Sequence, residues 1–435
     1  MHRYLATRHP SRSALISASI AILILALGLA GRPASAADAG NQVTGEWPQW
    51  RGTTRDSSAA HLEAPATWPG ELREVWAVEV GPSDSGPVVA GGRVYTFTRV
   101  GEREVATAID LETGAVVWQE GEEVPYQPMV MVGIHGAGPY STPLVADGKL
   151  FTLGISQILT ARDTATGKLE WQRKFDSEFK VTQPFYGNSL SPILVDGLLV
   201  VEVGGGGNGA VLAVDPATGK DRWRLAGDGP AYGSPIAVEI EGTRQIVTLT
   251  QRRLIGVEAA TGKLLWETPF KVDVDNTAIT PVYHEGLLIL GGNRRPLQAY
   301  RVNRKSDGFA VTEVWSNPAV SLVYSTPVIA DGSVVAFASQ KKGQLVVLDP
   351  ATGAVTWEAE GRQGDHSYLV ASGSTVLSFL VGGEVEVAAI ADGKAKVVAR
   401  YDVASSEVWS HPVVLDRHLL VKDRSHLRLW AINAN

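Results

Sequence analysis

The sequence predicts an all-β fold: an eight-bladed β-propeller of four-stranded antiparallel blades, closed by an N-terminal strand that completes the last blade. Three observations predict it. A turn motif, [DE]-x-x-T-G-x-x-x-W, recurs along the chain, and eight apolar segments of one type alternate with it. No Pro/Ser-rich linker divides the chain. So long a chain exceeds what one hydrophobic core usually serves, so a repeat architecture is expected.

The first 36 residues predict a secretory signal peptide. Basic residues precede an apolar run (14–30), and a small-residue site follows at Ala34-Ser35-Ala36. An uncleaved membrane anchor is the less favoured alternative, because the run is shorter than the roughly 20 residues that span a bilayer. The chain has no cysteine, so a lipid anchor on cysteine is excluded. We therefore expect an exported, periplasmic monomer that begins near Ala37 and has no membrane anchor.

The charge of the chain argues against nucleic acid as a partner. The formal net charge is −7, and removal of residues 1–36 takes four arginines and no acidic residue, which leaves −11. A chain this acidic is poorly suited to phosphate backbones. The absence of cysteine also means that packing alone holds the fold.

The turn motif sets the period of the repeat. Its spacings are 53, 52, 43 and 91 residues, and Trp315 marks a degenerate copy inside the longest interval, where Asp307-Gly308 replaces Thr-Gly. A period near 45 with internal turns is typical of four-stranded propeller blades. The complete copies begin at Asp110, Asp163, Asp215, Glu258 and Asp349.

Each part of the motif has a physical role. The residues before the acid form apolar runs, as in AVLAV (210–214), which favour strands. The acid accepts backbone hydrogen bonds, and glycine takes the positive-φ position of a tight turn. The tryptophan then lies on the outer strand, where we expect its ring to pack between neighbouring blades.

Eight inner strands are visible, and their number predicts how the ring closes. They begin near residues 84, 140, 189, 232, 278, 324, 366 and 409. Outer strands number eight only if EVWAVEV (74–80) is counted, so the strand that carries Trp76 should complete the last blade. Seven blades is the main alternative. We expect residues 37–73 to wrap the surface as an extension and residues 74–435 to form the propeller.

The turn motif and the STP-type inner strands, such as YSTP at 140–143 and 324–327, resemble the PQQ-like (quinoprotein-type, BamB-like) propeller repeat. The opening WPQWRG (47–52) is similar to the start of many exported bacterial proteins of this superfamily. The resemblance implies one of two functions. One is oxidation of alcohols or sugars with PQQ and calcium, and the other is the non-catalytic partner binding of BamB-type accessory proteins.

The chain departs from both types. It lacks the adjacent cysteine pair of the large quinoproteins and the lipid-anchoring cysteine of BamB-type proteins. No motif places a calcium set of Glu, Asn and Asp, or a catalytic Asp. The residue roles of neither type therefore transfer to this sequence.

Aromatic residues recur at one position, the mouth of successive inner strands, where Ser189 takes their place in one copy. They could form a stacking platform for a flat ligand or merely plug the channel. The histidines His135, His366 and His411 also lie near inner strands, but at different offsets, so ordinary hydrogen bonding is favoured over a shared metal site. The aromatic residues are Tyr140, Tyr232, Tyr324 and Trp409.

Paired cations recur in the loops between the second and third strands, in QRR (251–253), NRR (293–295), QKK (340–342) and KDR (422–424). These loops open on the same face as the inner-strand mouths, so they could surround the channel and attract an anion. Solvated hairpin turns are the alternative. The candidate ligand-binding cations are Arg252, Arg253, Arg294, Arg295, Lys341 and Lys342.

These observations favour a non-catalytic binding or scaffold protein that presents its channel face to a protein partner or an anionic small molecule, with no cofactor and no metal. The alternative is a divergent PQQ-dependent dehydrogenase that uses calcium, since PQQ is a flat tricarboxylate.

Overall fold

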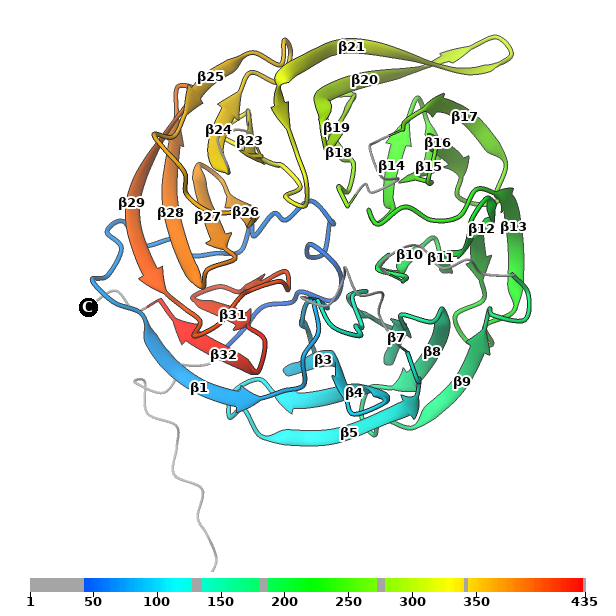
Figure 1. The fold of residues 1–435 in the computed structure, drawn as a ribbon, viewed down its shortest axis with the longest axis horizontal. Coiled ribbons are helices and arrows are strands. Elements are labelled where there is room, and N and C mark those ends of the chain that lie inside the picture. The colour runs from blue at the N-terminus through cyan, green and yellow to red at the C-terminus, as the bar shows by residue number, and fades with distance from the viewer. Residues whose placement is uncertain (1–42, 127–134, 180–186, 272–277, 340–342, 433–435) are drawn as a thin grey trace, which may run out of the picture. The chain divides into compact units, whose positions relative to one another are not determined.

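The computed structural model describes residues 43–126, 135–179, 187–271, 278–339 and 343–432. Their strands form eight four-stranded antiparallel sheets arranged in a ring (Figure 1). The predicted eight-bladed propeller is confirmed, and the seven-bladed alternative is wrong. Among these residues, no helix is long and apolar enough to cross a membrane.

The blades follow chain order and are numbered 1 to 8, each running from its inner to its outer strand. Blade 1 contains β2 (Val88–Ala90), β3 (Arg93–Val100), β4 (Arg103–Asp110) and β5 (Val116–Glu123), and blade 2 contains β6 (Leu144–Ala146), β7 (Lys149–Leu153), β8 (Ile158–Asp163) and β9 (Leu169–Lys174). Blade 3 contains β10 (Ile193–Val195), β11 (Leu198–Gly205), β12 (Asn208–Val214) and β13 (Asp221–Gly227), and blade 4 contains β14 (Ile236–Ile240), β15 (Thr243–Leu249), β16 (Arg253–Glu258) and β17 (Leu264–Pro269).

Blades 5 to 8 continue around the ring. Blade 5 contains β18 (Val282–His284), β19 (Leu287–Gly292), β20 (Arg295–Lys305) and β21 (Gly308–Ser321), and blade 6 contains β22 (Val328–Ala330), β23 (Ser333–Ala338), β24 (Gln344–Leu348) and β25 (Val355–Glu358). Blade 7 contains β26 (Ser367–Ser372), β27 (Thr375–Leu380), β28 (Glu384–Ala391) and β29 (Lys394–Asp402), and blade 8 contains β30 (Val413–Val414), β31 (His418–Lys422), β32 (His426–Ala431) and β1 (Arg73–Glu79).

The N-terminal strand closes the ring, as the sequence predicts. β1 pairs antiparallel with β32, with Trp76 opposite Leu429. The Trp76 indole N–H donates to the Leu111 carbonyl of blade 1 at 3.0 Å. The first and last blades are therefore held together by strand pairing and by a buried ring.

The turn motif lies between the third and fourth strands of a blade, where it contacts the tryptophan of the preceding blade. Asp110 accepts hydrogen bonds from the backbone N–H and the hydroxyl of Thr113, and these bonds lower the pKa of the carboxyl. Gly114 then adopts φ 72°. A Cβ on Gly114 would lie 2.9 Å from the Trp76 ring, so glycine is required both for the backbone conformation and for the ring packed on it.

The same pairing recurs around the ring and breaks at blade 5. The rings of Trp118 and Trp171 pack on Gly167 and Gly219 of the following blades. Blade 5 instead has the long β20–β21 hairpin and no Thr-Gly turn. Trp266 of blade 4 accordingly turns to its own blade and donates to the Gln245 side chain at 2.7 Å.

Apolar side chains of the middle strands fill the spaces between blades. One cluster joins Val200 and Val211 of blade 3 to Ile246 and Val257 of blade 4, all of them buried. Because both faces of a blade are covered, middle strands such as β12 and β24 are continuous apolar runs rather than alternating ones. The core is thus a series of inter-blade layers around the axis.

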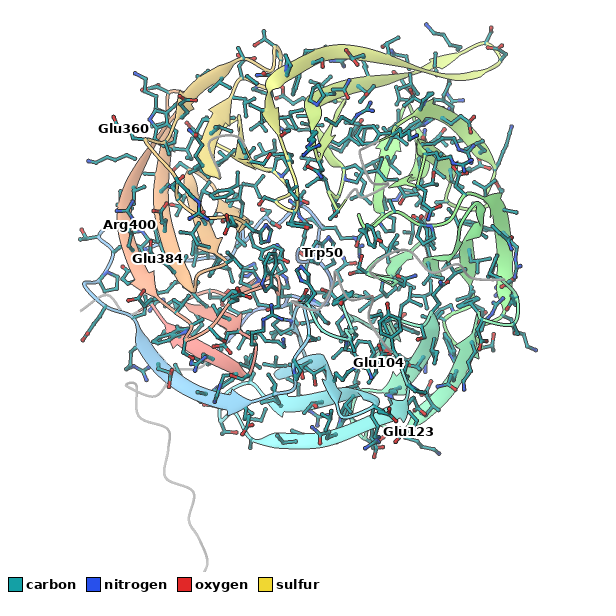
Figure 2. All side chains as sticks on the ribbon, viewed as in Figure 1. Trp50, Glu104, Glu123, Glu360, Glu384 and Arg400 are labelled. Carbon is teal, nitrogen blue, oxygen red and sulfur yellow. The ribbon has the colours of Figure 1, made fainter. Side chains whose placement is uncertain are left out.

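Residues 43–72 form no blade, and part of this segment lies inside the ring, not on its outer surface as expected. Trp47 is 1% exposed and pairs with Val89 of β2. Ser58 forms a bridge with Ala371 of β26 in blade 7, two blades away from β2. Figure 2 shows Trp50 near the centre of the ring. The expectation of a surface wrap is therefore wrong for this stretch, because its indole and guanidinium groups find buried partners on the inner strands.

Candidate functional site

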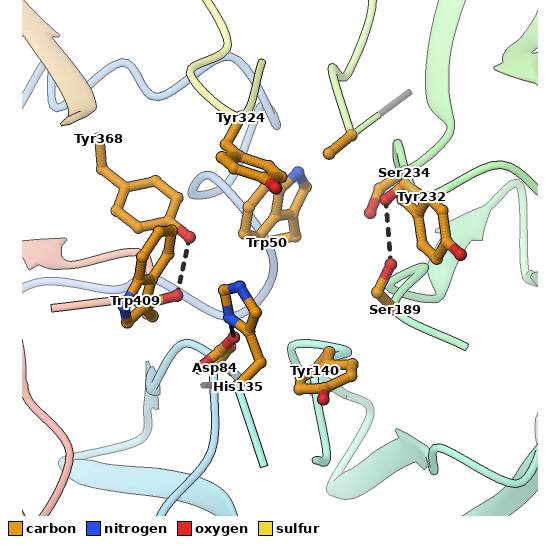
Figure 3. A pocket seen from close by; sticks show the side chains of 11 residues that line it. Trp50, Asp84, His135, Tyr140, Ser189, Tyr232, Ser234, Tyr324, Tyr368 and Trp409 are labelled. Carbon is orange, nitrogen blue, oxygen red and sulfur yellow. Dashed lines mark hydrogen bonds and ion pairs between the residues drawn. The ribbon is translucent and has the colours of Figure 1, made fainter. Parts of the chain in front are cut away.

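Six aromatic rings line a cavity of about 120 Å³ on the propeller axis (Figure 3). Five of them come from the mouths of inner strands on different blades, and the sixth comes from the N-terminal segment. The four aromatic residues singled out in the sequence are all among them, together with Ser189. The six rings are Trp50, Tyr140, Tyr232, Tyr324, Tyr368 and Trp409.

Hydroxyl groups of the STP-type segments fix the inner-strand mouths against one another. The Gly86 amide donates to the Thr142 hydroxyl of the next blade at 3.0 Å. The Thr142 amide donates to the Ser191 hydroxyl at 2.9 Å, and the Ser191 amide donates to the Ser234 hydroxyl at 3.0 Å. Because each bond joins neighbouring blades next to the cavity, the motif positions the aromatic rings and is structural in itself.

Trp50 reaches the cavity from the WPQWRG segment. Its indole N–H donates to the Thr280 hydroxyl of blade 5 at 3.0 Å. Its ring meets Tyr368 edge-on, with centroids 6.4 Å apart, and His411 with centroids 5.1 Å apart. The chain therefore fills part of its own axial channel with an aromatic side chain.

Two buried arginines hold this segment in the ring. The Arg51 guanidinium donates to the Pro327 carbonyl of blade 6 at 2.8 Å, and Arg55 donates to the Pro192 carbonyl of blade 3 at 2.8 Å. Burial lowers the pKa of Arg51 to about 10 and that of Arg55 to about 9, so both stay protonated at neutral pH. Hydrogen bonds from charged donors contribute about 1.5–3 kcal/mol each, which makes the pair a strong anchor.

An Asp–His pair supplies the charged groups of the cavity wall. The Nδ1 atom of His135 lies 2.7 Å from Oδ2 of Asp84. The imidazole meets Trp409 edge-on at a centroid distance of 4.7 Å and Tyr140 at 6.5 Å. Among the described residues that line the cavity, Asp84 is the only carboxylate, and none is lysine or arginine.

The two other histidines support the cavity from behind. His366 stacks on Trp409 with an interplanar angle of 6° and lies 2.9 Å from the Ser325 hydroxyl. His411 bonds through Nδ1 to the Pro412 carbonyl and through Nε2 to the Ser57 hydroxyl. Burial lowers the pKa of both His366 and His411 to about 3, so both are neutral. The favoured interpretation of these two as hydrogen-bonded histidines agrees with this geometry.

The described residues contain no group of three or more His, Cys, Asp or Glu side chains that could hold a metal ion. His135 pairs with Asp84, whereas His366 and His411 use serine and backbone partners. The three histidines therefore do not converge on one point within the described part of the chain.

The basic loops do not line the cavity in the way the sequence suggested. Arg253 is held by Asp228 at 3.0 Å and by Glu267, both within its own blade. Arg295 lies over the Phe270 ring at 3.9 Å. Arg253 and Arg295 therefore have partners close to their own loops, and neither lines the cavity. Arg252 and Arg294 are also absent from the lining, whereas Lys341 and Lys342 lie outside the described residues.

Lys422, from the fourth basic loop, is buried instead of solvated. It is 1% exposed, and its ammonium group donates to the Ser83 carbonyl at 2.6 Å. Burial lowers the pKa of Lys422 to about 8, and the nearby carboxylate of Asp84 opposes that change. This cation therefore lies behind the cavity wall, and it is not part of a positive rim.

Five lining residues of the cavity were not singled out in the sequence: Trp50, Asp84, Ser234, Ala278 and Tyr368. Tyr368 lies two positions after the histidine of the weak HSYLVASG copy, so the inner-strand alignment missed it. Trp50 belongs to a segment without a strand pattern. The two tryptophans and the arginine of WPQWRG could have indicated that this segment is buried.

Comparison with known proteins places the repeat in a family. The profile described as "Outer membrane protein assembly factor BamB" matches residues 101–307 and 278–424. Quinohemoprotein alcohol dehydrogenase ADH-IIG of Pseudomonas putida is 27% identical over 231 residues, which cover 48% of this chain and 30% of that protein. The chain thus matches less than a third of that relative's length.

Solved structures share the fold. BamB from Moraxella catarrhalis superposes with a TM-score of 0.60 at 14% identity, over 83% of this chain and 99% of that one. Quinohemoprotein alcohol dehydrogenase from Comamonas testosteroni superposes with a TM-score of 0.63 at 14% identity, over 92% of this chain and 82% of that one. At such identities the likeness concerns the fold alone, and the fold accommodates both kinds of protein.

Proposed function

We propose that this chain, which belongs to the β-propeller family described as "Outer membrane protein assembly factor BamB", is a non-catalytic binding protein. Its ligand site is the axial aromatic cavity. One observation carries the proposal. The chain's own Trp50 occupies part of the channel and leaves a small cavity of six rings with the Asp84–His135 pair in its wall. Such a concave, mostly apolar lining with few polar groups is typical of a binding site.

The lining does not fit PQQ with calcium, the group that the dehydrogenase relatives would imply. PQQ carries three carboxylates, and Asp84 would repel them in a site where no described lining residue is a cation. The cavity of about 120 Å³ is also smaller than the roughly 300–1,000 Å³ of pockets for larger ligands. The expected anionic ligand is disfavoured for the same reason.

The setting of the proposed role is the bacterial periplasm, where a monomeric propeller would present its loop-lined face. The family's description as an assembly factor supports a protein partner on that face. The small cavity beneath it would receive a small molecule or a side chain of that partner.

Fluorine NMR on protein labelled with 5-fluorotryptophan tests the proposal. The substitutions Trp50→Phe and Trp409→Phe assign the two cavity signals among the 12 tryptophans. We expect compounds from a panel of small metabolites to shift both signals saturably. A parallel incubation with PQQ, calcium and a redox dye should give no oxidation of alcohols or sugars. Dye reduction that depends on PQQ would contradict the proposal and favour a divergent dehydrogenase.

A further inference from the structure

The axial cavity combines ring faces from several directions with a carboxylate, and we propose that its ligand is a small organic ammonium cation. The inference rests on the proposed function and specifies the chemical class of the ligand. Aromatic faces carry negative electrostatic potential, and rings that surround a desolvated cation bind it. Trp50, Tyr140, Tyr232, Tyr324 and Trp409 enclose the cavity from separate segments of the chain (Figure 3).

The charges around the cavity favour a cation over an anion. Asp84 lines the cavity directly, and its side chain is 16% exposed. Glu407 accepts a hydrogen bond from the Trp409 indole at 2.9 Å, which places an acceptor at the ring edge and leaves the ring face electron-rich. Glu407 is paired with Arg424 at 2.8 Å and is not among the described lining residues, so Asp84, which contacts His135, is the carboxylate that a ligand in the cavity would meet.

Two basic side chains lie near Asp84 and affect how a ligand would meet this carboxylate. Lys422 lies behind the wall and directs its ammonium group to the Ser83 carbonyl, so it reduces the field of Asp84 without occupying the cavity. His135 contacts Asp84 directly, and both side chains line the cavity.

The size of the cavity sets the kind of cation. A space of about 120 Å³ is large enough for a methylated ammonium head group. Methylated ammonium groups cannot donate N–H bonds, and their recognition depends on ring faces and on a nearby negative charge. The rings and the single carboxylate of this cavity provide both.

Calorimetry with choline and its neutral isostere 3,3-dimethyl-1-butanol tests the proposal on the full-length protein. The two molecules have nearly the same shape and differ in charge. We expect choline to bind roughly ten- to thirtyfold more tightly, the ratio that a desolvated cation–π site gives. Asp84→Asn and Trp409→Leu should each weaken choline binding at least severalfold and leave the isostere nearly unaffected. Trp430→Leu, in β32 and away from the cavity lining, is the matched control.

Thermal unfolding of each variant separates loss of the site from loss of the fold, and Trp409→Phe, which keeps an aromatic face, should restore most of the affinity in a folded protein. Equal affinity for choline and the isostere would overturn the proposal, as would choline binding that survives both Asp84→Asn and Trp409→Leu. If choline fails while other compounds shift the Trp50 and Trp409 signals, this inference is wrong and the proposed function stands. If no compound shifts them, both are wrong.

Discussion

Glu202 provides a sharp test of how the blades pack. It lies in β11 of blade 3, is 1% exposed, and accepts a hydrogen bond from the hydroxyl of Thr248 in blade 4. Burial raises the pKa of its carboxyl to about 8, and the Thr248 hydroxyl opposes this only in part. The perturbation is Glu202→Gln, which keeps the shape and an acceptor oxygen but cannot ionise.

The sign and size of the effect follow from the linkage between protonation and folding. The folded-state pKa is raised, so the folded state holds the proton more tightly than the unfolded chain. Its stabilising contribution is complete below the ordinary pKa of 4.5 and is lost as the pH rises through about 8. At 1.36 kcal/mol for each pH unit between those limits, wild type loses about 3–5 kcal/mol that Glu202→Gln retains.

Urea unfolding monitored by tryptophan fluorescence at pH 5 and pH 9 measures this difference. Near pH 5 the two proteins should unfold at similar urea concentrations, and at pH 9 the variant should be clearly more stable. Glu104, whose pKa burial raises to about 7, is common to both proteins and cancels in the comparison. Glu239→Gln, at an exposed position of β14, is the matched control and should change nothing. Equal stability of wild type and Glu202→Gln at both pH values would refute the reasoning.

Three further predictions follow from the same geometry. Gly167→Ala should destabilise the protein by about 2–4 kcal/mol in urea unfolding, because the new Cβ would lie 2.7 Å from the Trp118 ring at a positive φ; Gly148→Ala, with positive φ but open space, should cost only about 1 kcal/mol, and equal costs would contradict the packing. Trp76→Ala should cost about 3–5 kcal/mol and make β1 sensitive to proteolysis, whereas unchanged protease resistance would argue against ring closure by this strand. Arg253→Ala should leave choline affinity unchanged in calorimetry, since this side chain pairs within its own blade, and a loss of affinity would restore the basic-rim hypothesis.

The repeating features of the fold could be predicted because their causes are local. Asp110, Thr113 and Gly114 form one turn within five residues, so the motif can be read directly from the sequence. The ring closure could be predicted by counting strands, because the last blade lacked an outer strand and the strand of Trp76 supplied it. The aromatic residues at the inner-strand mouths were found because equivalent positions of a propeller meet at its axis.

The remaining features depend on contacts that no local pattern encodes. Trp50 reaches Thr280 across 230 positions of sequence, and no periodicity relates the two. The local partners of the basic loops could not be read from sequence, which gives the face on which a loop opens but not the carboxylates and rings beside it. Arg253 therefore meets Asp228 and not the channel. Sequence offered Lys422 as part of a positive rim or of a solvated turn, whereas it is buried against the Ser83 carbonyl.

A crystal structure of the protein grown with choline, PQQ and calcium together is the decisive measurement, because the two kinds of ligand then compete for the axial cavity. It tests whether the cavity binds an organic ammonium cation. We expect choline density among the rings beside Asp84, with Trp50 still bonded to Thr280. PQQ and calcium on the axis, with Trp50 displaced from the channel, would contradict it.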